Sequence, residues 1–347
     1  MPRASFLSPF RPHPVPGAGR PADSAPPKCL TLDSNAGPLP SATARGQPKG
    51  PYRTRTHSTG EWKSTAERKS EAPLSQCPRH LRAQPLRTGE GRHTWGRPVA
   101  RERRGGYRRQ GERPVFLPLR VAREGASVAL VGRREERLTD LAAEITGAGG
   151  KALVVPADIT TAQAAAEAVE RTVEGLGRLD TLVNNAGLML LGPAPSADLN
   201  DWRRMIDINL MGLMYTAHAA VPHLVKAAAE EPRQVADIVN IGSLAGRNAY
   251  AMSAVYSATK FGVGAFSEAL RQELARQHVR VSVIEPGSVD TELRTHNPDV
   301  IQQHIVAALG DIERLQSRDI ADTVGYIVTR PRHVAVAELL VRPTEQA

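Results

Sequence analysis

The chain has 347 residues and a formal net charge of +9, and this charge is divided sharply near residue 118. Residues 1–118 contain 18 arginines and 4 lysines against 8 acidic residues, a net charge of +14, together with 18 of the 27 prolines, whereas the rest of the chain has a net charge of −5. The sequence has neither an uncharged apolar run of the roughly 20 residues that a membrane helix needs nor a secretory apolar segment after Met1, which excludes the membrane and secreted classes and favours a cytoplasmic protein.

Residues 1–118 are predicted to form a disordered arm rich in arginine and proline. They show no sustained helical or strand period, and low hydrophobicity with high net charge cannot offset the entropy of an ordered chain. Both cysteines, Cys29 and Cys77, lie in this arm, so neither a disulfide framework nor a cysteine-based zinc site is expected in the globular part, and we predict no metal site. The arginines of residues 101–109 surround Tyr107, which is typical of nucleic-acid or membrane binding, and a transit peptide is another interpretation. We favour a segment that was never selected for a role.

From Ala126 onward, strands and helices are expected to alternate. The predicted strands are Ser127–Gly132, Ala152–Pro156, Asp180–Asn184, Ala236–Ile241 and Val279–Glu285. The predicted helices are Glu135–Thr146, Thr161–Glu174, a long helix after Asp198 and Ala254–Gln277. This alternation predicts the α/β class, a doubly wound (Rossmann-type) parallel sheet with helices on both faces and a ligand at the carboxyl ends of its strands.

Three residues in the second half of this region indicate acid–base chemistry. Tyr256 and Lys260 lie four residues apart in a predicted helix, which places both side chains on one face. An ammonium group near a phenol favours the phenolate, so we expect Lys260 to lower the pKa of Tyr256. Ser243 follows the strand Ala236–Ile241, where its hydroxyl can hold a substrate carbonyl. Each feature alone also fits an ordinary solvated helix face or a cap.

Two further polar features are candidates for the same site. Asn184-Asn185-Ala186-Gly187 follows a strand end, where small and amide residues let a nucleotide approach the main chain. A plain polar turn is the alternative. Asn209 lies within a predicted helix, where asparagine is unfavourable by propensity, and either a functional role or simple exposure would explain it.

Taken together, these motifs resemble the short-chain dehydrogenase/reductase family from about Val121 to the C-terminus. The resemblance rests on Asn-Asn-Ala-Gly at 184–187, Asn209, Ser243, Tyr-x-x-x-Lys at 256–260, and Pro286-Gly287 with Thr291. Segments 188–193, 202–209, 260–268 and 285–294 are most similar to the group of NADP-dependent 3-hydroxy acid dehydrogenases and clavaldehyde dehydrogenase.

The resemblance implies a role for each matching residue. Tyr256 would be the acid/base, Lys260 would lower its pKa and hold the nicotinamide ribose, and Ser243 would position the substrate carbonyl. Asn209 would hold a water of the proton relay. The implied cofactor contacts are Asn185, Ala186, Gly187, Tyr256, Lys260, Pro286, Gly287, Val289 and Thr291, and Asp158 with Ile159 resembles the family's adenine contact. Residues from Leu293 to about Leu315 resemble the family's substrate lid.

The residues after the strand Ser127–Gly132 favour NADP over NAD. NAD enzymes place an acidic residue there for the ribose 2′-hydroxyl, whereas this chain has Arg133 and Arg134. Two guanidinium groups suit a 2′-phosphate, which they can bind bidentately. The alternative is a solvated helix start.

The start of the domain departs from the family pattern, which has a strand followed by Thr-Gly-x-x-x-Gly-x-Gly. Family spacing predicts the loop at 107–114, which has a single glycine, and the strand at about 100–106, which is too charged for a buried strand. Pro118 would lie inside the next helix at a cost of about 3 kcal/mol. The sequence therefore predicts a domain at 119–347 without its first strand and Gly-rich loop. Residues 1–118 would then come from another reading frame or a wrong start, or the protein has lost cofactor binding.

The sequence thus predicts an NADP(H)-dependent oxidoreductase that interconverts an alcohol with an aldehyde or ketone at a Ser-Tyr-Lys site. Its expected partner is a small carbonyl or alcohol substrate, with no membrane or nucleic acid. The family implies a homodimer or homotetramer formed through helices Leu199–Leu224 and Ala254–Leu274. The alternative is an inactive or cofactor-free binding protein whose basic arm binds nucleic acid.

Overall fold

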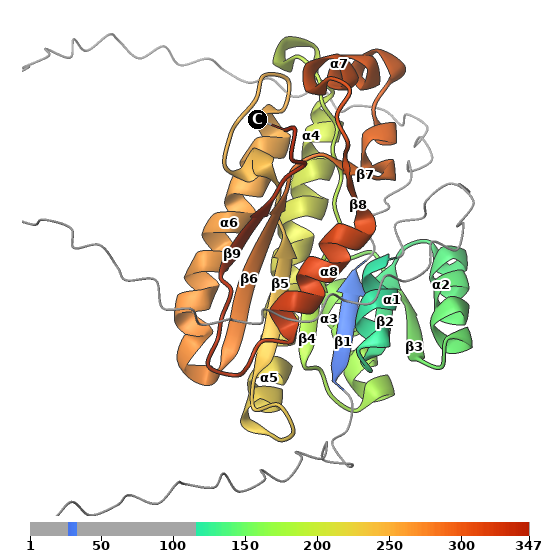
Figure 1. Cartoon of the computed structure of the whole chain (residues 1–347), viewed down its shortest axis with the longest axis vertical. Helices are drawn as coiled ribbons and strands as arrows, with labels where there is room; N and C mark the ends of the chain where they lie inside the picture. Colours follow the sequence, from blue (N-terminus) through green and yellow to red (C-terminus); the bar gives the residue numbers. More distant parts are fainter. Residues whose placement is uncertain (1–26, 33–115, 347) are drawn as a thin grey trace, which may run out of the picture. The chain divides into compact units, whose positions relative to one another are not determined.

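A computed structural model describes residues 27–32 and 116–346 (Figure 1). These residues belong to one compact unit formed by residues 1–38 and 110–347, and the second unit, residues 39–109, lies outside the described part. The strands are β1 (Lys28–Leu32), β2 (Ser127–Gly132), β3 (Lys151–Pro156), β4 (Thr181–Asn184), β5 (Ala236–Ile241), β6 (Val279–Pro286), β7 (Val289–Asp290), β8 (Leu315–Gln316) and β9 (Glu338–Val341). The helices are α1 (Phe116–Arg123), α2 (Glu135–Gly147), α3 (Ala162–Leu176), α4 (Leu199–Ile206), α5 (Leu213–Ala229), α6 (Ala254–Leu274), α7 (Asp299–Leu309) and α8 (Ser317–Val328).

Seven parallel strands form the main sheet in the order β3-β2-β1-β4-β5-β6-β9. The sequence order runs outward from β1 in both directions, which is the doubly wound arrangement. β7 and β8 form a separate two-stranded ribbon, and short helical turns η1 (Ala194–Ser196), η3 (Leu244–Gly246), η4 (Ala275–Gln277) and η5 (Glu292–His296) lie in the connections. The predicted α/β, Rossmann-type fold is confirmed.

The prediction that the first strand is missing is wrong. β1 occupies the centre of the sheet, with Leu30 opposite Ala129 of β2 and Leu182 of β4. Cys29 and Leu32 are each 2% exposed and Leu30 is 0% exposed, so apolar side chains point to both faces. A short run that is apolar on both faces suits a buried parallel strand. The spacing typical of the family places the first strand at about 100–106. That position is wrong because residues 33–115 separate β1 from α1.

The amino end of β1 is tied to its neighbours by main-chain and side-chain bonds. The Lys28 amide donates to Asp180 Oδ2 at 2.8 Å, and the Asp180 amide donates to the Lys28 carbonyl at 2.9 Å. The Ser127 amide donates to the Pro27 carbonyl at 2.9 Å. Asp180 is 1% exposed and also accepts from Arg178, so its buried charge is paired. These bonds anchor β1 from both sides.

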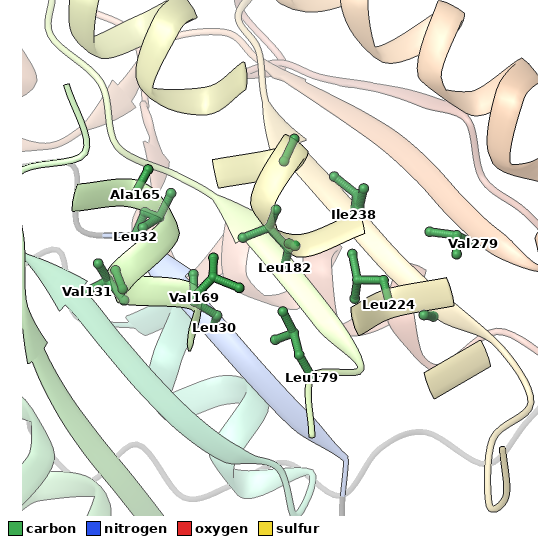
Figure 2. Close-up of a cluster of buried hydrophobic side chains, with 14 of the residues drawn as sticks. Leu30, Leu32, Val131, Ala165, Val169, Leu179, Leu182, Leu224, Ile238 and Val279 are labelled. Carbon is green, nitrogen blue, oxygen red and sulfur yellow. The ribbon is translucent and has the colours of Figure 1, made fainter. Parts of the chain in front are cut away.

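Two apolar clusters cover the opposite faces of the sheet. Figure 2 shows the cluster in which Leu30 and Leu32 of β1 meet Val169 of α3 and Leu224 of α5. The other cluster joins Cys29 of β1 to side chains of α1, α2 and α8. Neighbouring strand residues alternate between the two clusters, as the two-residue period of a strand requires. The result is a three-layer arrangement with the sheet between helices.

Pro118 lies within α1, of which Phe116 is the first described residue, so the prediction that this proline falls inside a helix is confirmed. The long helix expected after Asp198 is divided, because the π-helical turn η2 (Asp207–Gly212) separates α4 from α5.

Among the described residues, no helix has the length and apolar character needed to cross a membrane. The predicted arm lies outside the described residues except for Pro27–Leu32 and Phe116–Pro118. Family spacing would place the first strand at 100–106 and the Gly-rich loop at 107–114. Both ranges also lie outside the described residues.

Candidate functional site

The candidate site lies at the edge of the sheet where the parallel strands end. Gly132 pairs with Pro156, Asn184 pairs with Asn240, and Ile241 of β5 pairs with Ile284 of β6, so all these strand ends share one edge. The strand arrows in Figure 1 point to the end of this unit where α7 and the β7–β8 ribbon lie. Almost every residue that the sequence proposed for a site follows one of these strand ends or lies on a helix beside them.

Tyr256, Lys260 and Ser243 come together at this edge. Tyr256 and Lys260 lie on α6 and are each 6% exposed, and the Lys260 ammonium is 5.9 Å from the centre of the Tyr256 ring. Lys260 Nζ donates to the carbonyl of Ile241 at 2.8 Å, which fixes the ammonium at the end of β5. The Ser243 side chain lies beside the Tyr256 phenol and favours its charged form. A half-buried hydroxyl thus lies beside a buried phenol and a buried cation.

A close approach between two segments holds Ser243 beside α6. Ser243 begins the short helical turn η3, and its Oγ accepts from the Ala245 amide at 3.1 Å. At Gly246 a Cβ atom would lie 2.8 Å from the main-chain oxygen of Lys260, nearer than real Cβ atoms come. Glycine therefore lets the turn that carries Ser243 rest directly on the turn of α6 that carries Lys260.

Burial sets the pKa values of the two titrating groups. Burial raises the pKa of Tyr256, although the Ser243 side chain opposes the rise. Burial lowers the pKa of Lys260 to about 8. The net direction is opposite to the fall that the sequence predicts, because desolvation of the phenolate is the largest effect. Near pH 7 the phenol holds its proton and most of the lysine is charged.

Asn209 is buried inside the π-helical turn η2, so the alternative of simple exposure is wrong. Its side chain is 1% exposed and pairs with Leu188: Oδ1 accepts from the Leu188 amide at 2.7 Å, and Nδ2 donates to the Leu188 carbonyl at 2.8 Å. Nδ2 also lies 3.2 Å from Oγ1 of Thr259 in α6, and that hydroxyl donates to the Tyr256 carbonyl. Asn209 thus joins the segment after β4 to the helix of Tyr256. π-turns are often found at functional sites.

Arginines gather where β2 ends. Arg133 Nη1 lies 3.9 Å from Asp158 Oδ2, and Arg134 Nη1 lies 3.8 Å from Glu292 Oε2. Arg137, on the first turn of α2, donates from Nη1 to both Glu292 oxygens at 3.0 and 3.2 Å. A carboxylate from η5 therefore already neutralises part of the positive charge of two of these guanidinium groups.

The other proposed cofactor contacts surround the same edge. Asn185, Ala186 and Gly187 follow β4, and a Cβ atom at Gly187 would lie 3.7 Å from Asn209 Oδ1 and 4.0 Å from Lys260 Nζ. Ile159 packs into the core, where its Cδ1 would lie 3.0 Å from a Cβ atom at Gly212.

The residues after β6 are held by the C-terminal segment. The Gly287 amide donates to the Val341 carbonyl at 2.7 Å, and a Cβ atom at Gly287 would clash with the Gln346 side chain at 2.3 Å. Pro286 ends β6, Val289 begins β7, and Thr291 caps η5 by accepting from the Leu293 amide at 3.3 Å.

Sequence reasoning missed several residues of this region. Arg137 and Glu292 face the arginine group from two elements, and Thr259 connects Asn209 to the helix of Tyr256. Asn297, between η5 and α7, is 4% exposed and bonds to the segment after β4. Arg137 could have been found, because it lies one helical turn beyond Arg133 and Arg134. The contacts of the others join residues far apart in the chain and leave no local signal.

Comparison with known proteins gives consistent matches. The family model described as short chain dehydrogenase matches residues 117–300. Sulfoacetaldehyde reductase 2 of Chromohalobacter salexigens is 40% identical over 229 residues, which cover 66% of this chain and 88% of the relative. An uncharacterized oxidoreductase of Staphylococcus aureus is 35% identical over 221 residues, covering 63% and 87%. The closed form of serine dehydrogenase complexed with NADP+ superposes with a TM-score of 0.60 at 33% identity, covering 67% of this chain and 91% of that one.

Proposed function

The chain belongs to the short-chain dehydrogenase family, and from this premise we propose that it is an NADP(H)-dependent enzyme that interconverts an alcohol with an aldehyde or ketone. The observation that carries the proposal is the half-buried Ser243 beside the buried Tyr256 and Lys260 at the carboxyl edge of the sheet. This group contains a hydrogen-bond donor for a carbonyl oxygen, a protonated acid, and a cation beside that acid.

In this proposal each member of the group has one task during reduction. The Ser243 hydroxyl donates a hydrogen bond to the substrate oxygen, and Tyr256 gives its proton to that oxygen as the carbonyl carbon is reduced. The Lys260 ammonium stabilises the phenolate that remains. When bound, the reduced nicotinamide supplies the hydride for the carbonyl carbon. Burial keeps the phenol protonated near pH 7, which is the form that donates.

Asn209 acts in this proposal as a positioning residue. Both ends of its amide have protein partners, Leu188 and Thr259, and these bonds hold the segment after β4 against the turn of α6 that carries Tyr256. A water of the proton relay would then bind close to Asn209 without replacing these bonds. The relay itself is a proposal from the family resemblance.

The residues at the strand ends fit NADP. Arg133 and Arg134 follow β2 at the position that decides the ribose contact, and Arg137 adds a third guanidinium group. The Glu292 carboxylate is paired with Arg134 and Arg137, so a 2′-phosphate would displace it to reach these two guanidinium groups. Asp158 and Ile159 would contact the adenine.

The main chain and small residues at the other strand ends would hold the rest of the cofactor. Residues Asn185, Ala186 and Gly187, with Pro286, Gly287, Val289 and Thr291, would line its course toward Lys260 and Tyr256. The relative that binds NADP+ in its solved structure supports this choice of cofactor.

The substrate class that we propose is a small carbonyl compound or its alcohol. The two named relatives, a sulfoacetaldehyde reductase and a serine dehydrogenase, supply the first compounds to test. Sulfoacetaldehyde with NADPH and serine with NADP+ cover the two directions of the reaction.

Replacing Tyr256 by phenylalanine tests the proposal. Tyr256→Phe removes the acidic proton and keeps the ring, so we expect kcat to fall by about 100- to 10,000-fold, the usual worth of a general acid. NADPH affinity should change little. The matched control is Tyr326→Phe on α8, because Tyr326 is 50% exposed and far from the described site residues in sequence. Turnover by Tyr256→Phe above a tenth of the wild-type rate would contradict the proposed role.

A further inference from the structure

Asn297 joins two segments that border the proposed substrate site. Its Oδ1 accepts from the Leu191 amide at 2.7 Å, and its Nδ2 donates to the carbonyls of Met189 at 2.9 Å and Arg294 at 3.1 Å. Asn297 is 4% exposed, so water cannot easily replace these bonds. One side chain thus connects the segment after β4 to the start of α7, more than 100 residues further along the chain.

The segment on one side of this connection is in contact with the proposed acid. Met189, Leu190 and Leu191 pack against an apolar cluster that contains Tyr256 and Met205. The Leu190 amide lies 3.4 Å from the Met205 sulfur, and the Gly192 amide donates to the Met252 carbonyl at 2.9 Å. Any movement of residues 188–191 would therefore reach the surroundings of Tyr256.

The helix on the other side has little packing of its own. No residue of α7 is buried, and Val300 is 69% exposed and Val306 45% exposed. Gln302 of α7 donates from Nε2 to the main-chain oxygen of Asn297 at 2.8 Å. Since burial of an apolar face normally holds a helix in place, the bonds at Asn297 must supply much of what holds α7 here.

We propose that Asn297 is a positioning residue that fastens α7 to residues 188–191 and so forms the substrate side of the site beside Tyr256. This inference rests on the proposed function. The side-chain amide of Asn297 suits this task because it both accepts and donates hydrogen bonds. The Leu191 N–H needs an acceptor, and the Met189 carbonyl needs a donor. Loss of either the Oδ1 or the Nδ2 hydrogen bonds of Asn297 leaves a buried main-chain group without its partner.

Two variants at Asn297 and one nearby test the proposal. Asn297→Ala removes the hydrogen bonds of both Oδ1 and Nδ2. Asn297→Asp keeps the side-chain volume and the acceptor for the Leu191 amide but loses the donor to the carbonyls of Met189 and Arg294. Gln302→Ala removes only the bond from α7 to the main chain of Asn297. Asn200→Ala is the matched control, because Asn200 is exposed on α4. Each protein is assayed as the full chain.

Hydrogen exchange reports the fastening directly and needs no cofactor. We expect the peptides that cover residues 188–191 and α7 to exchange at least about tenfold faster in Asn297→Ala and Asn297→Asp, while β4, β5 and β6 keep their protection. Gln302→Ala should show a smaller increase in α7, and Asn200→Ala none. Unchanged exchange of both segments in Asn297→Ala, or an equal loss of protection in the central strands, would overturn the proposal.

Kinetics separate a positioning role from a purely structural one. With sulfoacetaldehyde and NADPH, we expect both Asn297 variants to raise KM about tenfold or more while the Kd for NADPH stays within about twofold of wild type. A wild-type KM in a variant with fast exchange would overturn the positioning role. Absence of turnover in the wild-type chain would instead contradict the proposed function, and the exchange result would still decide whether Asn297 fastens α7.

Discussion

Lys260 combines a positive charge with almost complete burial, and this has a cost for stability. Its pKa falls from the ordinary value of 10.5 to about 8 because burial disfavours the ammonium. The fall corresponds to roughly 3 kcal/mol of free energy of unfolding, from which the hydrogen bond to the Ile241 carbonyl recovers about 1 kcal/mol. A residue kept at such a cost fits a functional rather than a stabilising role.

We therefore expect Lys260→Met to raise the free energy of unfolding by about 2 kcal/mol at pH 7. Between pH 8 and 10.5 the unfolded lysine binds more protons than the folded one, so the wild type gains stability as the pH rises. The advantage of Lys260→Met should accordingly be largest below pH 8 and shrink toward pH 10.5. Urea unfolding at both ends of this range measures the difference.

Lys226→Met on α5 is the matched control for this prediction, because Lys226 is exposed. It should change the free energy of unfolding little at either pH. A Lys260→Met protein that is less stable than the wild type at pH 7 would show that the ammonium stabilises the fold rather than straining it.

Sequence patterns identify the chemistry of the site better than its supports. Ser243, Tyr256 and Lys260 could be proposed because a hydroxyl, a phenol and an ammonium group suit acid–base chemistry and their spacing follows the family. Asn297 and Glu292 could not, since each acts through a contact with a segment that is distant in sequence. The direction of the Tyr256 pKa also escaped prediction, because it depends on burial that only the folded chain creates.

At the scale of elements, β1 is the feature on which the sheet depends. It separates β2 from β4, and without it two interior strands would lose their hydrogen-bond partners. The five strands from β2 to β6 could be predicted from their apolar runs. β1 could not, because its run of five residues lies within a proline-rich, charged stretch and far from the position that family spacing indicates.

Leu30→Ala tests the place of β1 in the sheet. Leu30 is 0% exposed and packs in the cluster of Figure 2, so we expect the free energy of unfolding to fall by about 2–5 kcal/mol. Leu199→Ala is the control, because Leu199 is 69% exposed, and it should have little effect. Urea unfolding of the full chain provides the comparison.

The thiol of Cys29 gives an independent check on the same strand. Cys29 is 2% exposed and burial raises its pKa to about 12, so in a Cys77→Ser chain it should react with a thiol reagent only after denaturation. Fast reaction in the native chain, or equal stability of Leu30→Ala and Leu199→Ala, would mean that residues 28–32 do not form the central strand.

At the scale of the whole molecule, the proposed enzyme needs its strand ends to act together. The Ser243, Tyr256 and Lys260 group lies at one part of the carboxyl edge, and the arginine group at β2 lies at another. A dinucleotide is the ligand that would contact both. Residues 107–114, where family spacing places a Gly-rich cofactor loop that the sequence lacks, lie outside the described residues, so cofactor binding is the property that most needs measurement.

The most direct measurement is calorimetric titration of NADPH and NADH into the full chain, with folding verified by circular dichroism. We predict saturable NADPH binding with a Kd below about 100 µM, in the usual range of enzyme–ligand affinities, and NADH binding at least about tenfold weaker, because it lacks the phosphate. Replacing Arg133 and Arg134 by alanine should remove this difference. A folded chain that binds neither dinucleotide would contradict the account and favour a cofactor-free binding protein.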